Sequence, residues 1–129
     1  MDELAPPTRS EAFLESSRLL MEGQTPRNIL LRALWVLRDP NRWVNYSRAV
    51  DDEGHAVAVD DPAATRWSIE GAVAMASNPH GILPQFFMKF LDEVSLALYQ
   101  EESVNCLEDY CGHMAIVCVL RRAIELASM

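Results

Sequence analysis

The most regular feature of the sequence is a run of large apolar residues that follows Pro84. They recur three or four positions apart, at Phe87, Phe90, Leu91, Val94 and Leu98. This spacing brings them onto one face of an α-helix. We therefore predict a helix over residues 84–98, and its apolar face requires other elements to pack against it.

Four further helices are predicted from capping signals and apolar spacing. Thr8 and Glu11 have the spacing of a capping box, which marks the start of a helix. Pro26 and Pro62 mark two more starts, because proline loses no hydrogen bond at the first helical position. The expected ranges of these four helices are 9–22, 26–39, 62–78 and 110–127. In the third of them, Gly71 and the alanines around it predict the close approach of a neighbouring helix.

A small β-hairpin is predicted over residues 44–59. Residues 44–50 and 55–59 suit short strands, and the acidic stretch 51–54 between them suits a turn. The fold class that follows is mainly α, a compact bundle of about five helices with one hairpin. We expect residues 1–7 to be disordered and residues 8–129 to form a single domain.

Composition argues against several classes of partner. The formal net charge is −8, which opposes binding to the phosphate backbone of nucleic acids. The longest apolar run, 114–120, is far shorter than a membrane-spanning helix requires. No secretory signal opens the chain, and three cysteines do not suit a closed set of disulfides. We expect a cytoplasmic protein with reduced thiols, without nucleic-acid or membrane partners and without a cofactor.

The sharpest local cluster of reactive side chains is Cys106, Cys111, His113 and Cys118. Thiolates and imidazole are the ligands that zinc prefers, and a thiol beside a histidine can act as a nucleophile. The spacing lacks the tight pair of ligands that is typical of structural zinc sites. The sequence therefore favours buried or half-buried structural cysteines, with no metal and no catalytic residue assigned.

Two acidic features are typical of a solvated surface. Asp51, Glu53 and Asp60 can be laid over a calcium-binding loop, but Ala49 stands where the first ligand belongs. Solvated turn carboxylates account for them better. Glu70 lies one helical turn after Arg66 in the predicted helix, and such a pair is usually a surface ion pair. The common nucleotide-binding and hydrolase motifs are absent from the sequence.

Two tryptophans flank the predicted hairpin and give the candidate binding residues. Trp43 and Trp67, together with Arg48 and Asp51, could line a small pocket or form a contact surface for a partner. The alternative is that both rings only seal the hairpin onto the helices, and the sequence favours it. His113, with its neighbouring cysteines, is the remaining candidate for ligand binding.

The chain resembles a family of small bacterial and phage-borne proteins classed as a domain of unknown function. The resemblance rests on short pieces spread over most of the chain: Trp43, Ala49, Asp51, Gly54, Asp61-Pro62, Ala64, Arg66-Trp67, Gly71-Ala72 and Arg122-Ala123-Ile124. The family has cysteine at position 68, where this chain has Ser68, and an Asn-Asp pair near Asn105-Cys106. The resemblance implies a compact helical domain of bacterial origin and no particular activity.

Two functions remain open at this point. The first is a non-enzymatic interaction or regulatory domain, partnered by another protein or by a second copy of itself. The second is a small ligand-binding protein or enzyme that uses a pocket at the hairpin or at the cysteine and histidine cluster. The absence of catalytic motifs favours the first.

Overall fold

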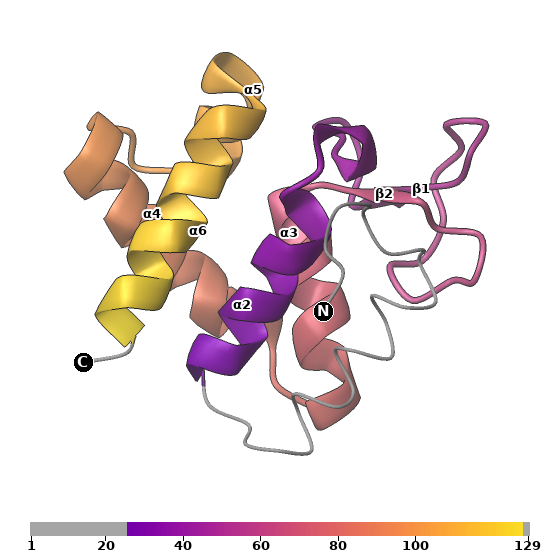
Figure 1. The fold of residues 1–129 in the computed structure, drawn as a ribbon, viewed down its shortest axis with the longest axis horizontal. Coiled ribbons are helices and arrows are strands. Elements are labelled where there is room, and N and C mark those ends of the chain that lie inside the picture. The colour runs from indigo at the N-terminus through magenta and orange to yellow at the C-terminus, as the bar shows by residue number, and fades with distance from the viewer. Residues whose placement is uncertain (1–25, 128–129) are drawn as a thin grey trace, which may run out of the picture.

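The structure is a computed structural model that describes residues 26–127. The predicted helix over 9–22 and the predicted disorder of residues 1–7 lie outside the described residues. Helices dominate the described part of the chain, with one two-stranded antiparallel sheet (Figure 1). The elements in chain order are α2 (Pro26–Leu37), η1 (Pro40–Arg42), β1 (Ala49–Val50), β2 (Arg66–Trp67), α3 (Ile69–Ser77), η2 (Asn78–His80), α4 (Pro84–Tyr99), α5 (Val104–Cys111) and α6 (His113–Ala127). The predicted class, a mainly α bundle with one small hairpin, is confirmed.

Helix α2 occupies the middle of the bundle. It packs against α3 and α6, while α4 packs against both of those helices and α5 packs against α6. Figure 1 shows the small sheet and α4 at opposite ends of the molecule. The predicted apolar face of residues 84–98 is confirmed in its main part, since Phe87, Leu91 and Val94 are buried. The fully enclosed centre of the core includes Ile29, Leu30, Ala33, Leu37, Ile69, Val73, Ile116, Val119 and Leu120.

The sheet differs from the predicted hairpin in its second strand. Ala49 pairs with Trp67 and Val50 with Arg66, in antiparallel register. The predicted turn over 51–54 does form, but only a single bridge joins Val50 to Ala56. Burial explains the choice of partner, because Trp67 is 1% exposed whereas residues 55, 56 and 58 are exposed. Pairing through residues 66–67 thus encloses a large indole ring.

Helix α3 begins seven residues later than the predicted start at residue 62. Asp61 and Pro62 form a turn instead, in which the Asp61 carboxylate accepts the Ala63 N–H at 2.8 Å. The true cap is Ser68, whose Oγ accepts the Gly71 N–H at 3.1 Å. An aspartate before a proline serves a turn as well as a helix start, so the sequence signal was ambiguous.

A close neighbour does lie at Gly71, but it is the backbone at Arg48, just before β1, and not the helix that was predicted. A Cβ atom built on Gly71 would lie 1.7 Å from the Arg48 carbonyl oxygen. That oxygen also accepts the Ser68 N–H at 3.2 Å. The small residue at position 71 therefore lets the chain at Arg48 lie directly on the first turn of α3.

The predicted last helix, 110–127, corresponds mainly to α6, and a separate helix, α5, forms over the stretch before it that was predicted to be a link. Helix α5 begins at Val104, where Asp92 of α4 accepts the Val104 N–H at 2.8 Å and Ser103 accepts the Cys106 N–H at 3.3 Å. It ends at Gly112, whose φ of 82° favours glycine. Helix α6 follows from His113. Within residues 26–127, every helix is too short or too polar to span a membrane.

Candidate functional site

A hollow of about 230 Å³ lies between the chain before β1, the start of α3 and helix α5. All of its lining residues are polar or charged, and they come from segments far apart in the sequence. They are Asn45, Ser47, Arg48, Ser68, Glu70, Asn105, Glu108 and Asp109. Pockets for drug-sized ligands measure about 300–1,000 Å³ and are mostly apolar. This hollow therefore suits a smaller and more polar ligand.

Glu108 is the most unusual side chain of the hollow, because it is a carboxylate that is only 3% exposed. Its Oε2 accepts the indole N–H of Trp43 at 2.7 Å and the backbone N–H of Ile69 at 2.8 Å. Its Oε1 accepts no hydrogen bond from the described residues. Two donors thus hold one oxygen of the carboxylate in place, and the side chain is part of the lining of the hollow.

Burial raises the pKa of Glu108 to about 7. The hydrogen bonds from Trp43 and Ile69 act in the opposite direction, and the negative charges of Asp109 and Glu70 add to the rise. Desolvation dominates because it penalises the charged form of a carboxyl group. A carboxyl group with such a pKa can take up and release a proton near neutral pH, which suits both cation binding and acid–base chemistry.

The position of Glu108 follows from the pattern of α5. Val104, Leu107 and Glu108 lie at i, i+3 and i+4, so all three fall on the face that packs against the bundle. Sequence reasoning missed this site, although the signal was present: a glutamate stands in the apolar face of a short amphipathic segment. The link from residue 108 to residues 43 and 69 could not be predicted, because it depends on how three elements pack.

Charge at the hollow is unbalanced. Arg48 forms an ion pair with Glu70, at 3.1 Å between Nη2 and Oε2, and the two side chains are 59% and 34% exposed. An ion pair with this exposure contributes little to stability. Arg48 is the single cation of the lining, against the three carboxyl groups of Glu70, Glu108 and Asp109, so the hollow has an excess of acidic groups when Glu108 is ionised.

Three of the predicted binding residues lie near this carboxylate. Arg48 lines the hollow and Trp43 donates to Glu108. His113 packs on Trp43, with ring centroids 5.7 Å apart, and its Nε2 contacts the carbonyl oxygen of Leu37. The histidine is thus connected to the carboxylate through the indole ring.

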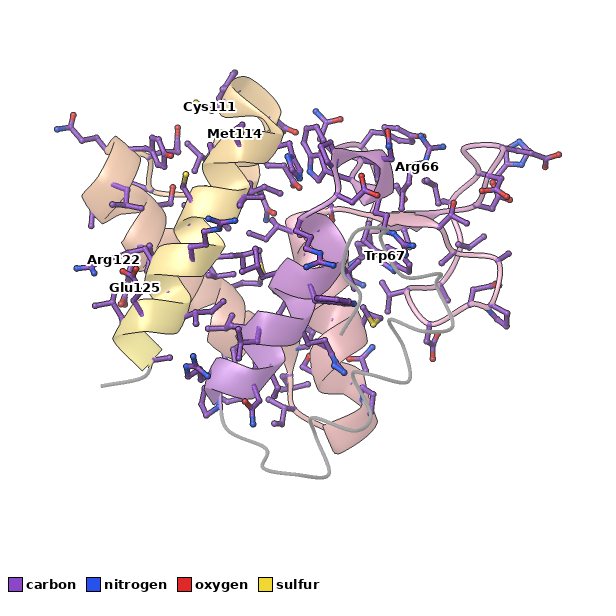
Figure 2. All side chains as sticks on the ribbon, in the orientation of Figure 1. Arg66, Trp67, Cys111, Met114, Arg122 and Glu125 are labelled. Carbon is purple, nitrogen blue, oxygen red and sulfur yellow. The ribbon has the colours of Figure 1, made fainter. Side chains whose placement is uncertain are left out.

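The other two predicted binding residues serve the local structure. Trp67 is buried, and its indole N–H donates to the Val59 carbonyl oxygen at 3.0 Å. Figure 2 shows Trp67 and Arg66 together at the sheet. Of the two rings that were expected only to seal the hairpin, Trp67 does contact its chain, and Trp67 is not among the residues that line the hollow.

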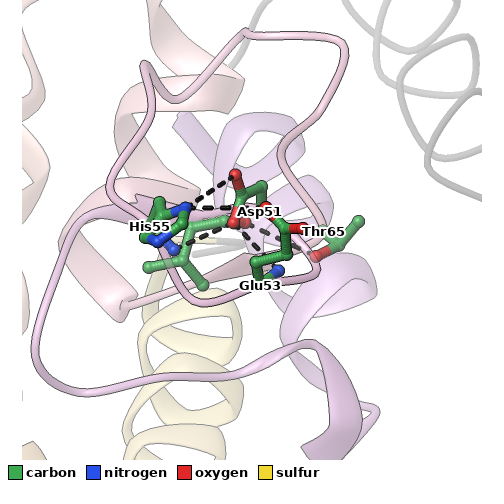
Figure 3. A network of polar contacts seen from close by, with 5 residues as sticks. Asp51, Glu53, His55 and Thr65 are labelled. Atoms are coloured by element: carbon green, nitrogen blue, oxygen red, sulfur yellow. Dashed lines mark hydrogen bonds and ion pairs between the residues drawn. The ribbon is translucent and has the colours of Figure 1, made fainter.

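Asp51 organises the turn over 51–54 (Figure 3). Its Oδ1 accepts the N–H groups of Glu53 at 3.0 Å and His55 at 2.9 Å. The hydrogen bond from the His55 backbone is the largest cause that lowers the pKa of Asp51. Asp51, Glu53 and His55 offer oxygen and nitrogen atoms within 4.8 Å of one another, but the carboxylate is already used by the turn.

The cysteines do not form the cluster that their spacing suggested. Cys106, Cys111 and Cys118 are all exposed and free, so the prediction of buried or half-buried thiols is wrong. Within residues 26–127 they do not join His113 in a metal-binding group. Cys118 lies within an apolar run of the sequence, yet its side chain is on the exposed face of α6.

Comparisons with known proteins add no relative to this description. Searches against protein-family models, curated proteins and solved structures give no match to this chain. The predicted resemblance to a bacterial domain of unknown function stays a prediction. The function is therefore inferred from the hollow and its buried carboxylate.

Proposed function

We propose that this domain binds a small, positively charged ligand in the hollow, with Glu108 as its principal anchor. The observation that carries the proposal is a buried carboxylate that lines the hollow and has one oxygen held by two donors. A buried ionised carboxylate is costly unless a charge or further donors compensate it. A ligand cation would supply that compensation.

The lining of the hollow favours an amine or a guanidinium group over an anion. Glu70 and Asp109 lie beside Glu108, and Arg48 is already paired with Glu70. An anion would meet three carboxyl groups and only one cation there. The amide and hydroxyl groups of the lining can accept further N–H donors from the ligand. The small volume limits the ligand to a few heavy atoms beyond the charged group.

Binding of such a cation depends on pH. The pKa of Glu108 is raised to about 7, so its carboxylate form is the minor form in mildly acidic solution and the major form in mildly alkaline solution. A cation binds the ionised form more tightly, and by linkage it lowers the pKa of the group it contacts. We therefore expect affinity to rise as the pH increases through 7.

The test uses the indole N–H of Trp43 as a reporter in NMR spectra, because this group donates directly to Glu108. The probes are ethylammonium and methylguanidinium, with acetate and glycerol as an anion and a neutral polyol. We expect the two cations to move the Trp43 indole signal and the Ile69 amide signal in a saturable manner. Glu108→Gln should abolish this response.

Glu93→Gln is the matched control, since Glu93 is an exposed glutamate of α4 away from the hollow. It should leave cation binding unchanged. Saturable binding of acetate in place of the cations would contradict the proposed ligand class. The absence of any saturable response at millimolar concentrations, on either side of pH 7, would contradict the proposal as a whole.

The interaction domain that the sequence favours is the second candidate, and one observation supports it. Tyr110 and Met114 are 82% and 73% exposed at the corner between α5 and α6. Figure 2 shows Met114 beside Cys111 at this corner. A second copy of the chain is the partner that this candidate names, because a two-fold contact places the same patch on both copies. Light scattering over a range of concentrations tests it, and a constant monomer mass would contradict it.

A further inference from the structure

A second hollow, of about 430 Å³, shares the lining residue Arg48 with the hollow around Glu108. Its lining differs in character, because five of its eight residues are apolar. These five are Val57, Ala58, Val59, Ala74 and Pro84. The polar hollow is thus next to a larger hollow with a mostly apolar wall.

The two hollows follow one face of α3. Glu70 lines the first hollow, and Ala74 and Asn78 line the second. These positions are i, i+4 and i+8, so they lie in one row along the helix. Each step in this row advances about 6 Å along the axis. A ligand that enters the first hollow can therefore continue along α3 into the second.

Arg48 lies where the two hollows meet, on the first turn of α3. Its carbonyl oxygen occupies the space beside Gly71, and its guanidinium group pairs with Glu70 at 3.1 Å. The Arg48 side chain is 59% exposed, and an ion pair with this exposure holds a side chain only weakly. The hydrocarbon stem of an arginine is apolar and can cover apolar surface. The side chain that the hollows share can therefore move and pack on an alkyl chain.

We infer that the ligand of this domain is an alkyl amine, with its charged group at Glu108 and its chain running past Arg48 into the second hollow. This inference rests on the proposed function, because it extends the cation proposed there. The first hollow alone admits only a few heavy atoms beyond the charged group, and the second hollow removes that limit. Asp60 lines the second hollow as well, so a chain that ends in a carboxylate is disfavoured.

Titrations with ethylammonium, butylammonium and hexylammonium, followed by NMR, test this inference. All three should move the indole N–H signal of Trp43, and only the two longer amines should move the Ala58 and Asn78 amide signals. We expect hexylammonium to bind at least about tenfold more tightly than ethylammonium, because each fully buried methylene tightens binding by about fourfold. Hexanol, which has the same chain without the charge, should bind more weakly than hexylammonium.

Ala58→Trp tests the second hollow directly, because the indole ring at this exposed position would fill part of it. It should reduce the advantage of hexylammonium over ethylammonium to less than about threefold and leave the affinity for ethylammonium unchanged. Ala63→Trp is the matched control, since Ala63 is also an exposed alanine and is not among the lining residues of either hollow. The dispersion of the amide signals checks that both variants are folded.

The outcomes separate this inference from the proposed function. Saturable binding of ethylammonium and hexylammonium with equal affinity would overturn the inference and leave the proposed function intact. Failure of every amine to bind would overturn both. An advantage of hexylammonium that survives in Ala58→Trp, or that is lost equally in Ala63→Trp, would place the alkyl chain outside the second hollow.

Discussion

Replacing Glu108 by glutamine should make the protein less sensitive to pH and more stable in alkaline solution. Glutamine keeps a side-chain oxygen that can accept from Trp43 and Ile69, but it cannot ionise. The substitution therefore separates the hydrogen-bonding role of this side chain from the cost of its charge.

The magnitude follows from the pKa of Glu108, which rises from an ordinary value of 4.5 to about 7. Because the native state holds this proton more tightly than the unfolded state, protonation stabilises the native state. That contribution is fully present below the unfolded pKa and is lost as the pH rises through the folded pKa. At about 1.4 kcal/mol per pH unit of difference, the wild-type protein should lose about 3 kcal/mol through this group between about pH 4.5 and pH 8.

Urea unfolding at a series of pH values between about 5 and 8 measures this loss. The difference in unfolding free energy between Glu108→Gln and wild type should grow with pH in favour of the variant, up to about 3 kcal/mol. Taking the difference cancels the contribution of every group that behaves alike in the two proteins. Glu93→Gln should follow the wild-type curve. A difference that does not change with pH would refute the reasoning, since it would mean that Glu108 has the same pKa in both states.

Three further substitutions have defined outcomes. Gly71→Ala should destabilise the protein by about 3 kcal/mol in urea unfolding despite the better helix propensity of alanine, because its Cβ would lie 1.7 Å from a backbone oxygen. Gly81→Ala is its control: there is no atom within 4 Å, and the φ of 69° alone should cost about 1 kcal/mol. Ser95→Ala should leave thermal stability unchanged or raise it by up to about 1 kcal/mol, because the buried Oγ has no hydrogen-bond partner; a clear loss would contradict this. Trp43→Phe removes a donor to the buried carboxylate and should cost about 1 kcal/mol more at pH 8 than at pH 5, and an equal cost at both would be the contrary result.

The parts of the fold that could be predicted are those whose signals are local. The helix over 84–98 was predicted within one residue of α4, because its apolar spacing is unbroken and Pro84 marks its start. The start of α2 at Pro26 was predicted for the same reason. The close approach at Gly71 could also be predicted, since glycine weakens a helix and is favoured there only where a neighbour leaves no room for a side chain.

The parts that were missed depend on contacts distant in sequence. Strand β2 forms at residues 66–67 because burying Trp67 against the chain at Val59 outweighs the weak strand tendency of residues 55–59. Helix α5 starts at residue 104, where Ser103 is the local cap and a carboxylate of α4, twelve residues earlier, accepts the Val104 N–H. The contacts of Trp67 with Val59 and of Val104 with Asp92 leave no local pattern in the sequence, whereas the cap at Ser103 was a local signal that was missed.

The sequence predicted some residues on or next to the hollow, but not the buried carboxylate at its centre. Trp43, Arg48 and His113 were selected from their types and positions, and they do lie on or next to the hollow. Glu108 was overlooked because acidic residues were interpreted as a solvated surface, which is their usual role. Whether the glutamate on the inner face of a short helix is covered depends on α3 and the chain before β1, and sequence does not reveal that packing.

A single oxygen atom, Glu108 Oε2, joins positions that are 65 and 39 residues apart along the polypeptide. The hollow is consequently complete only when these three segments of the chain are packed together. Binding of the proposed cation would then require the intact tertiary structure, and partial unfolding that detaches α5 would release the cation. We expect the Ile69 amide to exchange its hydrogen with solvent more slowly than its neighbours in α3, because it donates to Glu108.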